Sequence, residues 1–179
     1  MTGSLTLLLG GARGGKSTLA VQLARRSGRP VSFLATAEAL DEEMVERVSA
    51  HQAERPSDWR TYEVPHGLVS ALDAVDPESF VIVDCLTLWS ANRLFAGIDN
   101  PDVVDEARRF ATRAAAHPGG VVVVSNEVGL GIVPDNALSR TYRDLLGRVN
   151  AVVAERCERV FLVVAGRLLE LQTPAEAWP

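Results

Sequence analysis

The sequence predicts an α/β fold in which helices cover both faces of a mostly parallel sheet. Short apolar runs of strand length alternate along the chain with longer segments of helical periodicity. Polar or glycine-rich loops follow four of the apolar runs, and in a parallel sheet such strand ends meet at one edge. These loops begin at Gly10, Thr36, Asp84 and Asn126. A single ligand site at that edge would account for all four.

The first of these loops carries the strongest motif in the chain. The apolar run Leu5–Leu9 leads into Gly10, and four residues later come Gly15, Lys16 and Ser17. This is the spacing of a phosphate-binding loop, or P-loop. The glycines let backbone amides turn toward a polyphosphate, while Lys16 supplies a charge and Ser17 a hydroxyl for Mg²⁺. A glycine-rich turn with a surface lysine is the alternative, which the flanking strand and helix disfavour.

The remaining elements follow from periodicity and turn residues. Strands are expected at residues 5–9, 31–35, 59–64, 80–84 and 121–125, and helices at 17–26, 40–53, 86–96, 102–117 and 136–155. Two further runs, 159–164 and 167–171, flank Ala165-Gly166 and predict a terminal β-hairpin. Residues 173–179 are expected to be a frayed tail. The expected buried faces comprise Leu19, Ala20, Leu23 and Ala24 in the first helix and Leu138, Tyr142, Leu145, Leu146, Val149 and Val153 in the last.

Composition limits the class of protein and its partners. The 179 residues, 47% of them hydrophobic and 23% charged, are expected to form a single domain spanning residues 1–179. The net charge of −5 and the absence of a lysine or arginine run argue against a nucleic-acid partner. The two cysteines form neither a disulfide framework nor a metal set. We expect no signal peptide and no membrane span, and hence a cytoplasmic protein.

Three further features are candidates for chemistry, each with a structural alternative. Asp84 ends a buried strand and is expected to hold Mg²⁺ beside the P-loop, although an aspartate there can also cap the next helix. The loop 126–134 leaves another strand at the same edge, where it is either functional or an ordinary connection with Glu127 solvated. His51 lies on the apolar face of an expected helix, and its position alone favours packing over catalysis.

The ordered motifs together resemble one family, the bifunctional adenosylcobinamide kinase/adenosylcobinamide-phosphate guanylyltransferases of cobalamin biosynthesis. The most specific motif is Asn126-Glu127-Val128-Gly129-Leu130-Gly131-Ile132-Val133-Pro134. The other motifs are Gly10 to Ser17, Leu40 to Met44, His51, Arg55-Pro56, Trp59 to Thr61, Arg143-Asp144 and Gly147 to Asn150. The resemblance extends over nearly the whole chain, whereas the P-loop alone would fit many families.

The resemblance implies a RecA-like P-loop fold and two reactions. Such enzymes phosphorylate adenosylcobinamide with ATP or GTP, then transfer GMP from GTP to adenosylcobinamide phosphate, which gives adenosylcobinamide-GDP. The transfer passes through a GMP-histidine intermediate, which the resemblance places on His51. The implied nucleotide contacts are Gly10, Gly11, Ala12, Arg13, Gly14, Gly15, Lys16, Ser17, Ala35, Thr36, Ala37, Gln52, Ala53, Glu54, Arg55, Glu63 and Asp84. A homotrimer is implied as well, with Lys16 as a second catalytic residue and Ser17 and Asp84 as the metal ligands.

Two other functions are compatible with a P-loop. A RecA-like switch or motor ATPase would convert nucleotide turnover into conformational change, and dependence of turnover on a corrinoid acceptor would exclude it. A plain small-molecule kinase would lack the transferase step, and His51 with the Arg-Pro and Trp-Arg-Thr residues behind it argues against that class.

Overall fold

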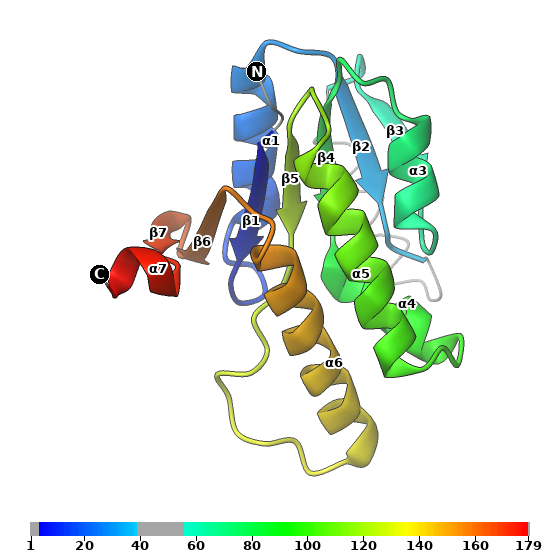
Figure 1. Cartoon of the computed structure of the whole chain (residues 1–179), viewed down its shortest axis with the longest axis vertical. Coiled ribbons are helices and arrows are strands. Elements are labelled where there is room, and N and C mark those ends of the chain that lie inside the picture. Colours follow the sequence, from blue (N-terminus) through cyan, green and yellow to red (C-terminus); the bar gives the residue numbers. More distant parts are fainter. Residues whose placement is uncertain (1–3, 39–55, 179) are drawn as a thin grey trace.

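The computed structural model describes residues 4–38 and 56–178, so the helix expected at 40–53 lies outside the described residues. In the described part, seven strands form one sheet in the order β3-β2-β4-β5-β1-β6-β7. The strands are β1 (Leu5–Leu9), β2 (Val31–Ala35), β3 (Arg60–Glu63), β4 (Phe80–Asp84), β5 (Val121–Val124), β6 (Arg159–Val164) and β7 (Arg167–Leu171). The helices are α1 (Lys16–Ser27), α3 (Leu68–Ala74), α4 (Leu86–Phe95), α5 (Asn100–Ala115), α6 (Ala137–Ala154) and α7 (Pro174–Ala177). Figure 1 shows their arrangement.

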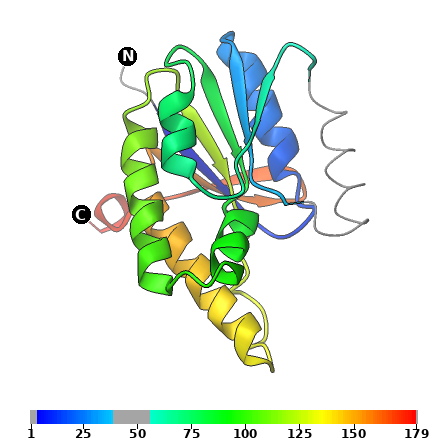
Figure 2. The same cartoon turned by 90° about the vertical axis from the view of Figure 1, so that its right-hand side faces the viewer.

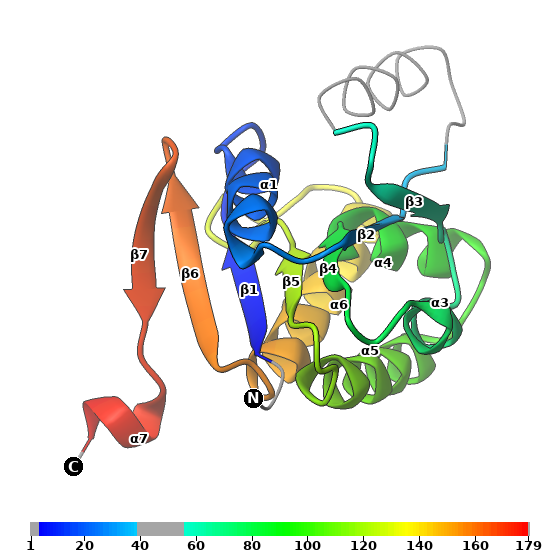
Figure 3. The ribbon, with the colours of Figure 1, turned by 90° about the horizontal axis from the view of Figure 1, so that it is seen from above.

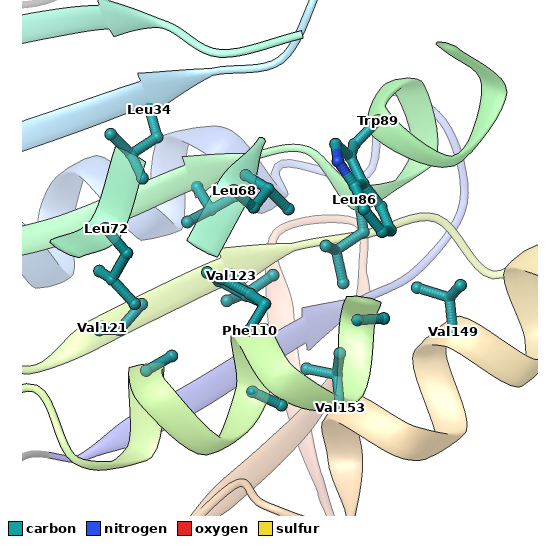
Figure 4. Close-up of a cluster of buried hydrophobic side chains, with 14 of the residues drawn as sticks. Leu34, Leu68, Leu72, Leu86, Trp89, Phe110, Val121, Val123, Val149 and Val153 are labelled. Carbon is teal, nitrogen blue, oxygen red and sulfur yellow. The ribbon is translucent and has the colours of Figure 1, made fainter. Parts of the chain in front are cut away.

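Helices cover both faces of the sheet, as the sequence predicts. Viewed from above, α1 lies on one face, and α3, α4, α5 and α6 lie on the other (Figure 3). The larger apolar core lies between the sheet and these four helices, where Trp89 and Phe110 are fully buried among strand valines and leucines (Figure 4). A smaller cluster joins Ala20 and Ala24 of α1 to the opposite face. Burial of these side chains, rather than helix propensity, fixes the layers.

The order of the strands places the ends of the predicted loops together. All neighbouring pairs from β3 to β6 are parallel, and only β7 is antiparallel to its neighbour. Strand β5 lies between β1, which leads into the P-loop, and β4, which ends in Asp84. The cross-strand partners at this level are Glu63, Ala35, Asp84, Val124 and Leu8. The carboxyl ends of the strands therefore form one continuous edge, as the sequence predicts.

The structure differs from the sequence expectations at four places. Helix α3 was not expected, and its Leu68 and Leu72 are buried in the larger core. The tail, expected to fray, contains the short helix α7, because Thr173 and Glu176 form a reciprocal capping box. Leu23 and Leu138 are exposed, contrary to expectation. Leu138 lies in the first turn of α6, which extends beyond the sheet edge and has no core beneath it (Figure 2).

His117 gives the fold a dependence on pH. Its Nδ1 accepts a hydrogen bond from the Gly119 amide at 3.2 Å, and its Nε2 has no hydrogen-bond partner among the described residues. Burial is the main cause that lowers the pKa of His117, with the Arg29 charge contributing. An unfolded histidine takes up a proton below about pH 6.5. Because the folded state binds that proton less readily, stability falls as the pH drops through that value.

We therefore expect His117→Asn, which keeps a side-chain acceptor, to weaken this pH dependence. Thermal unfolding followed by circular dichroism at pH 7.5, 6.0 and 5.0 should show a smaller drop in Tm for the variant than for the parent chain. Equal drops would contradict the assignment of the pH dependence to His117.

Candidate functional site

The P-loop joins β1 to α1 as an open cradle of backbone amides. Gly15 precedes α1 with a left-handed φ of 95°, and no side chain caps the helix. Within the loop, the Gly14 amide donates a hydrogen bond to the Gly11 carbonyl. The Leu19 amide donates to the Gly15 carbonyl, which closes the first turn of α1. The first amides of α1 thus remain available to an anion at the positive end of the helix.

The Lys16 side chain lies inside this loop. Its Nζ donates to the carbonyl oxygens of Gly10 at 3.0 Å and Gly11 at 2.7 Å, and the residue is 6% exposed. Burial lowers the pKa of Lys16, while the neighbouring Cys85 and Asp84 act in the opposite direction. Asp84 at the end of β4 is therefore close enough to the P-loop lysine for its charge to act on it.

The β6–β7 hairpin packs against the backbone of the P-loop. Its turn residues Ala165 and Gly166 both have positive φ, and the Gly166 amide donates to the Gly14 carbonyl at 2.9 Å. A Cβ on Gly15 would lie 3.2 Å from Cα of Gly166, and one on Gly10 would lie 2.3 Å from the Val163 carbonyl oxygen. The close approach of the two backbones explains why the loop needs glycine at these positions.

We expect Gly10→Ala to displace the P-loop, because its Cβ would overlap a backbone oxygen that no rotamer change can move. Overpacking of this kind costs roughly 1–3 kcal/mol, which for this length lowers Tm by several degrees. Affinity for GTP, measured by calorimetry, should fall as well. Gly11→Ala is the matched control for Tm, since a Cβ there meets nothing within 4 Å. A Gly10→Ala chain with the Tm and GTP affinity of the parent would contradict this account.

A second set of polar contacts fixes the ends of β2 and β4. Oγ1 of the buried Thr36 donates to the Cys85 carbonyl and accepts from the Cys85 amide, both at 2.7 Å. The Asn92 amide group donates to the carbonyls of Thr36 at 2.8 Å and Pro65 at 3.0 Å. These bonds hold the residues after β2 against the start of α4. Of the predicted nucleotide contacts, Ala35 to Ala37 therefore lie on a rigid support beside Asp84.

The predicted nucleotide-contact residues that the structure describes are spread along the carboxyl edge of the sheet rather than gathered around one point. Glu63 is exposed and pairs in register with Ala35, two strands from Asp84. Four interstrand spacings of about 4.8 Å separate β3 from β1, or roughly 19 Å, which is the scale of an extended nucleotide. His66 lies near the same edge, with Nε2 3.2 Å from Oε1 of Glu38. It thus has a carboxylate partner already.

Several predicted site residues lie outside the described residues. They are His51, Gln52, Ala53, Glu54 and Arg55. Cys85, which follows Asp84, is a nucleophilic side chain among the described residues, but burial raises the pKa of its thiol to about 11, and the Asp84 charge adds to this effect. A thiol with that pKa is almost entirely protonated at neutral pH, so Cys85 is unsuited to act as a nucleophile.

The loop after β5 passes directly beside the P-loop. The Glu127 amide donates to the Gly10 carbonyl at 3.1 Å, and a Glu127 carboxylate oxygen accepts from the Gly129 amide. Beyond this point the loop and the first turns of α6 extend past the sheet edge (Figure 1). Leu130, Ile132 and Val133 are largely exposed on this extension. The loop is therefore attached to the phosphate site at its base and solvent-exposed at its tip.

Sequence reasoning missed the residues that support these loops. Thr87 and Asn92 lie in helix α4, and the signal was the presence of polar residues on a helix that is largely apolar in sequence. Gly166 was recognised only as a hairpin turn. No periodic pattern indicates which loop a buried amide or hydroxyl will bond, because that depends on tertiary contacts.

A P-loop at the end of β1, an acid at the end of β4 and a strand between them define a protein of the RecA-like P-loop fold. The same fold occurs in the RadB recombinase, with a TM-score of 0.50 and 17% identity over 90% of this chain and 74% of that one. It also occurs in a KaiC-like protein from Pyrococcus horikoshii, with a TM-score of 0.52 and 13% identity over 90% of this chain and 71% of that one. At such identities the likeness concerns the fold alone.

The chain belongs to the family described as cobinamide kinase / cobinamide phosphate guanyltransferase, which matches residues 6–171. It is 46% identical to the bifunctional adenosylcobalamin biosynthesis protein CobP of Pseudomonas aeruginosa, over 93% of this chain and 96% of the relative. It is 37% identical to the bifunctional adenosylcobalamin biosynthesis protein CobU of Salmonella typhimurium, over 90% of this chain and 96% of the relative. These matches confirm the family predicted from the motifs.

Proposed function

We propose that this chain phosphorylates adenosylcobinamide with ATP or GTP and then transfers GMP from GTP to the resulting phosphate. The observation that carries the proposal is the attachment of the family's most specific loop to the P-loop, through the bond from the Glu127 amide to the Gly10 carbonyl. A corrinoid acceptor at this loop would meet the phosphates held by α1. Family membership supplies the identity of the acceptor.

In the kinase step, the acceptor hydroxyl oxygen attacks the γ-phosphorus and the nucleoside diphosphate leaves, while the hydroxyl proton is released. The amides of the loop bind the phosphates, and Lys16 moves from its two carbonyl partners to the outer phosphates. Ser17 and Asp84 would hold Mg²⁺, since both are hard oxygen donors at this edge and the Asp84 charge acts on Lys16. Bound Mg²⁺ would neutralise charge on the phosphate oxygens.

In the transfer step, an unprotonated ring nitrogen of His51 attacks the α-phosphorus of GTP. The bond from this phosphorus to the bridging oxygen breaks, and pyrophosphate leaves. A phosphate oxygen of adenosylcobinamide phosphate then attacks the same phosphorus, which breaks the P–N bond and releases His51. Nucleophilic catalysis of this kind divides one transfer into two steps. The reference pKa of imidazole, about 6.5, leaves the attacking nitrogen largely free at pH 7 to 8.

The products distinguish this proposal from a plain kinase and from a switch or motor ATPase. The chain is incubated with Mg²⁺ and adenosylcobinamide together with ATP, GTP or both. The corrinoid products are then separated, and their masses are measured by mass spectrometry. We expect ATP alone to give only the phosphate ester, whereas mixtures that contain GTP yield the GDP derivative. A rate of nucleotide hydrolysis that is the same with and without the corrinoid would favour a switch or motor ATPase.

We also propose a cytoplasmic homotrimer. Both cysteines are free, and no helix in the described ranges is long and apolar enough to cross a membrane. Exposed apolar side chains on the β6–β7 hairpin, including Val164, Leu168 and Leu169, offer a surface for subunit contact. Light scattering coupled to gel filtration measures the assembly, and a monomeric mass at micromolar concentration would contradict the trimer.

A further inference from the structure

The three residues that follow β5 keep a fixed backbone after the strand pairing has ended. Pairing stops at Val124, yet the Ser125 amide still donates to the Leu8 carbonyl at 3.0 Å. The Glu127 amide donates to the Gly10 carbonyl. Asn126 lies between these two contacts, and side chains from two different helices bind both of its backbone polar groups.

Asn150 of α6 binds one side of Asn126. It is 6% exposed, its Oδ1 accepts from the Ser125 hydroxyl at 2.7 Å, and its Nδ2 donates to the Asn126 carbonyl at 3.0 Å. The buried neighbours of Asn150 on the same helix, such as Val149 and Val153, are apolar. An apolar residue at position 150 could occupy this space, but it would leave the buried Ser125 hydroxyl and the Asn126 carbonyl without this partner. The hydrogen bonds of Asn150 therefore have a role beyond the packing of the core.

Thr87 of α4 binds the other side of Asn126. Its Oγ1 accepts from the Asn126 amide at 2.8 Å, and its carbonyl accepts from the Tyr142 hydroxyl at 3.0 Å. Burial raises the pKa of Tyr142, so the hydroxyl stays neutral and remains a donor. The amide and carbonyl of Asn126 are thus held between α4 and α6, independently of the sheet.

We propose that Asn150 and Thr87 are positioning residues that set the loop 126–134 against the P-loop, so that the acceptor meets the bound phosphates in a reactive orientation. This inference rests on the proposed function. Strand β5 lies between the P-loop strand and the Asp84 strand, so the direction in which its loop leaves the sheet determines how the acceptor approaches the phosphates. A displacement of about 1 Å from the productive geometry can lower a rate by up to roughly a hundredfold.

The test compares a variant that removes the hydrogen bonds with one that removes only packing. Asn150→Leu removes both hydrogen bonds and keeps the number and branching of the side-chain heavy atoms, while Val153→Ala removes core packing from the same helix. We expect Asn150→Leu to lower kcat/KM for adenosylcobinamide at least about tenfold, and to leave the Kd of a fluorescent GTP analogue within about threefold of the parent. Val153→Ala should lose stability without this selective change.

A second pair of variants tests the contact between Thr87 and the Asn126 amide. Thr87→Val removes the acceptor for the Asn126 amide and should act in the same direction as Asn150→Leu. Thr87→Ser keeps a hydroxyl and should restore most of kcat/KM for the corrinoid.

Three results would overturn the positioning role. The first is an Asn150→Leu chain with the same kinetics as Val153→Ala, and the second is an Asn150→Leu chain that loses GTP affinity and corrinoid turnover in parallel. The third is a Thr87→Ser chain as impaired as Thr87→Val. A parent chain that shows no corrinoid-dependent turnover would overturn the proposed function together with this role. A parent that turns over, with insensitive variants, would overturn the positioning role alone.

Discussion

His51→Ala should abolish GMP transfer and leave much of the kinase activity. Alanine removes the nitrogen that would attack the α-phosphorus. The Cys85 thiol is unsuited to take over this role, because its raised pKa keeps it protonated. The kinase step uses the γ-phosphate and needs no covalent intermediate, so the two activities should separate in this variant. The measurement is the corrinoid product from GTP, resolved into phosphate and GDP derivatives.

His66→Ala is the matched control, because it also removes a histidine, and the imidazole of His66 is paired with Glu38. The control should still form the GDP derivative. If His51→Ala continued to form it, and His66→Ala did not, the nucleophile would be His66 and our assignment would be wrong.

Lys16→Ala should depress both the kinase and the transferase activity by at least about an order of magnitude, a modest share of the catalytic contribution typical of such groups. Lys16 is the buried cation of the P-loop, and its two partners are carbonyl oxygens, which phosphate oxygens would replace. Loss of its charge leaves the departing phosphates less well stabilised. Initial rates at saturating GTP and corrinoid, measured for each step, give the effect.

Arg26→Ala provides the control for charge, since Arg26 is an exposed cation at the far end of the same helix. Its rates should match those of the parent chain. Undiminished turnover in Lys16→Ala, with an unchanged circular dichroism spectrum, would remove the P-loop lysine from the mechanism.

The sequence predicted the layers of the fold because its signals are local. Apolar runs and helical periodicity located every described strand and all the longer helices, and the Gly10 to Ser17 spacing located the phosphate site. The exposure of Leu23 and Leu138 was not predictable from periodicity, because it depends on which parts of α1 and α6 the rest of the fold covers. Helix α3 is short, and its single apolar pair at helical spacing, Leu68 and Leu72, is too brief a pattern to predict a helix; burial of that pair in the core accounts for the element.

The supports of the site were less predictable than its motifs. Asn150 formed part of a family motif, but its partners Ser125 and Asn126 are more than twenty residues away in sequence. The same is true of Thr36 and Asn92, which meet only after β2 and β4 pair. Hydrogen bonds of this kind depend on tertiary geometry, and a single sequence carries no periodic signal for them.

The most direct measurement of the central claim is covalent labelling of the parent chain by GTP. The protein is incubated with Mg²⁺ and GTP labelled at either the α- or the γ-phosphate, denatured, and digested for peptide mass spectrometry. We expect label from α-labelled GTP alone, on the peptide that contains His51, through a bond that is labile in acid and stable in base. Adenosylcobinamide phosphate should remove the label before denaturation. Label from γ-labelled GTP, label on another residue, or no label in a chain that forms the GDP derivative would contradict it.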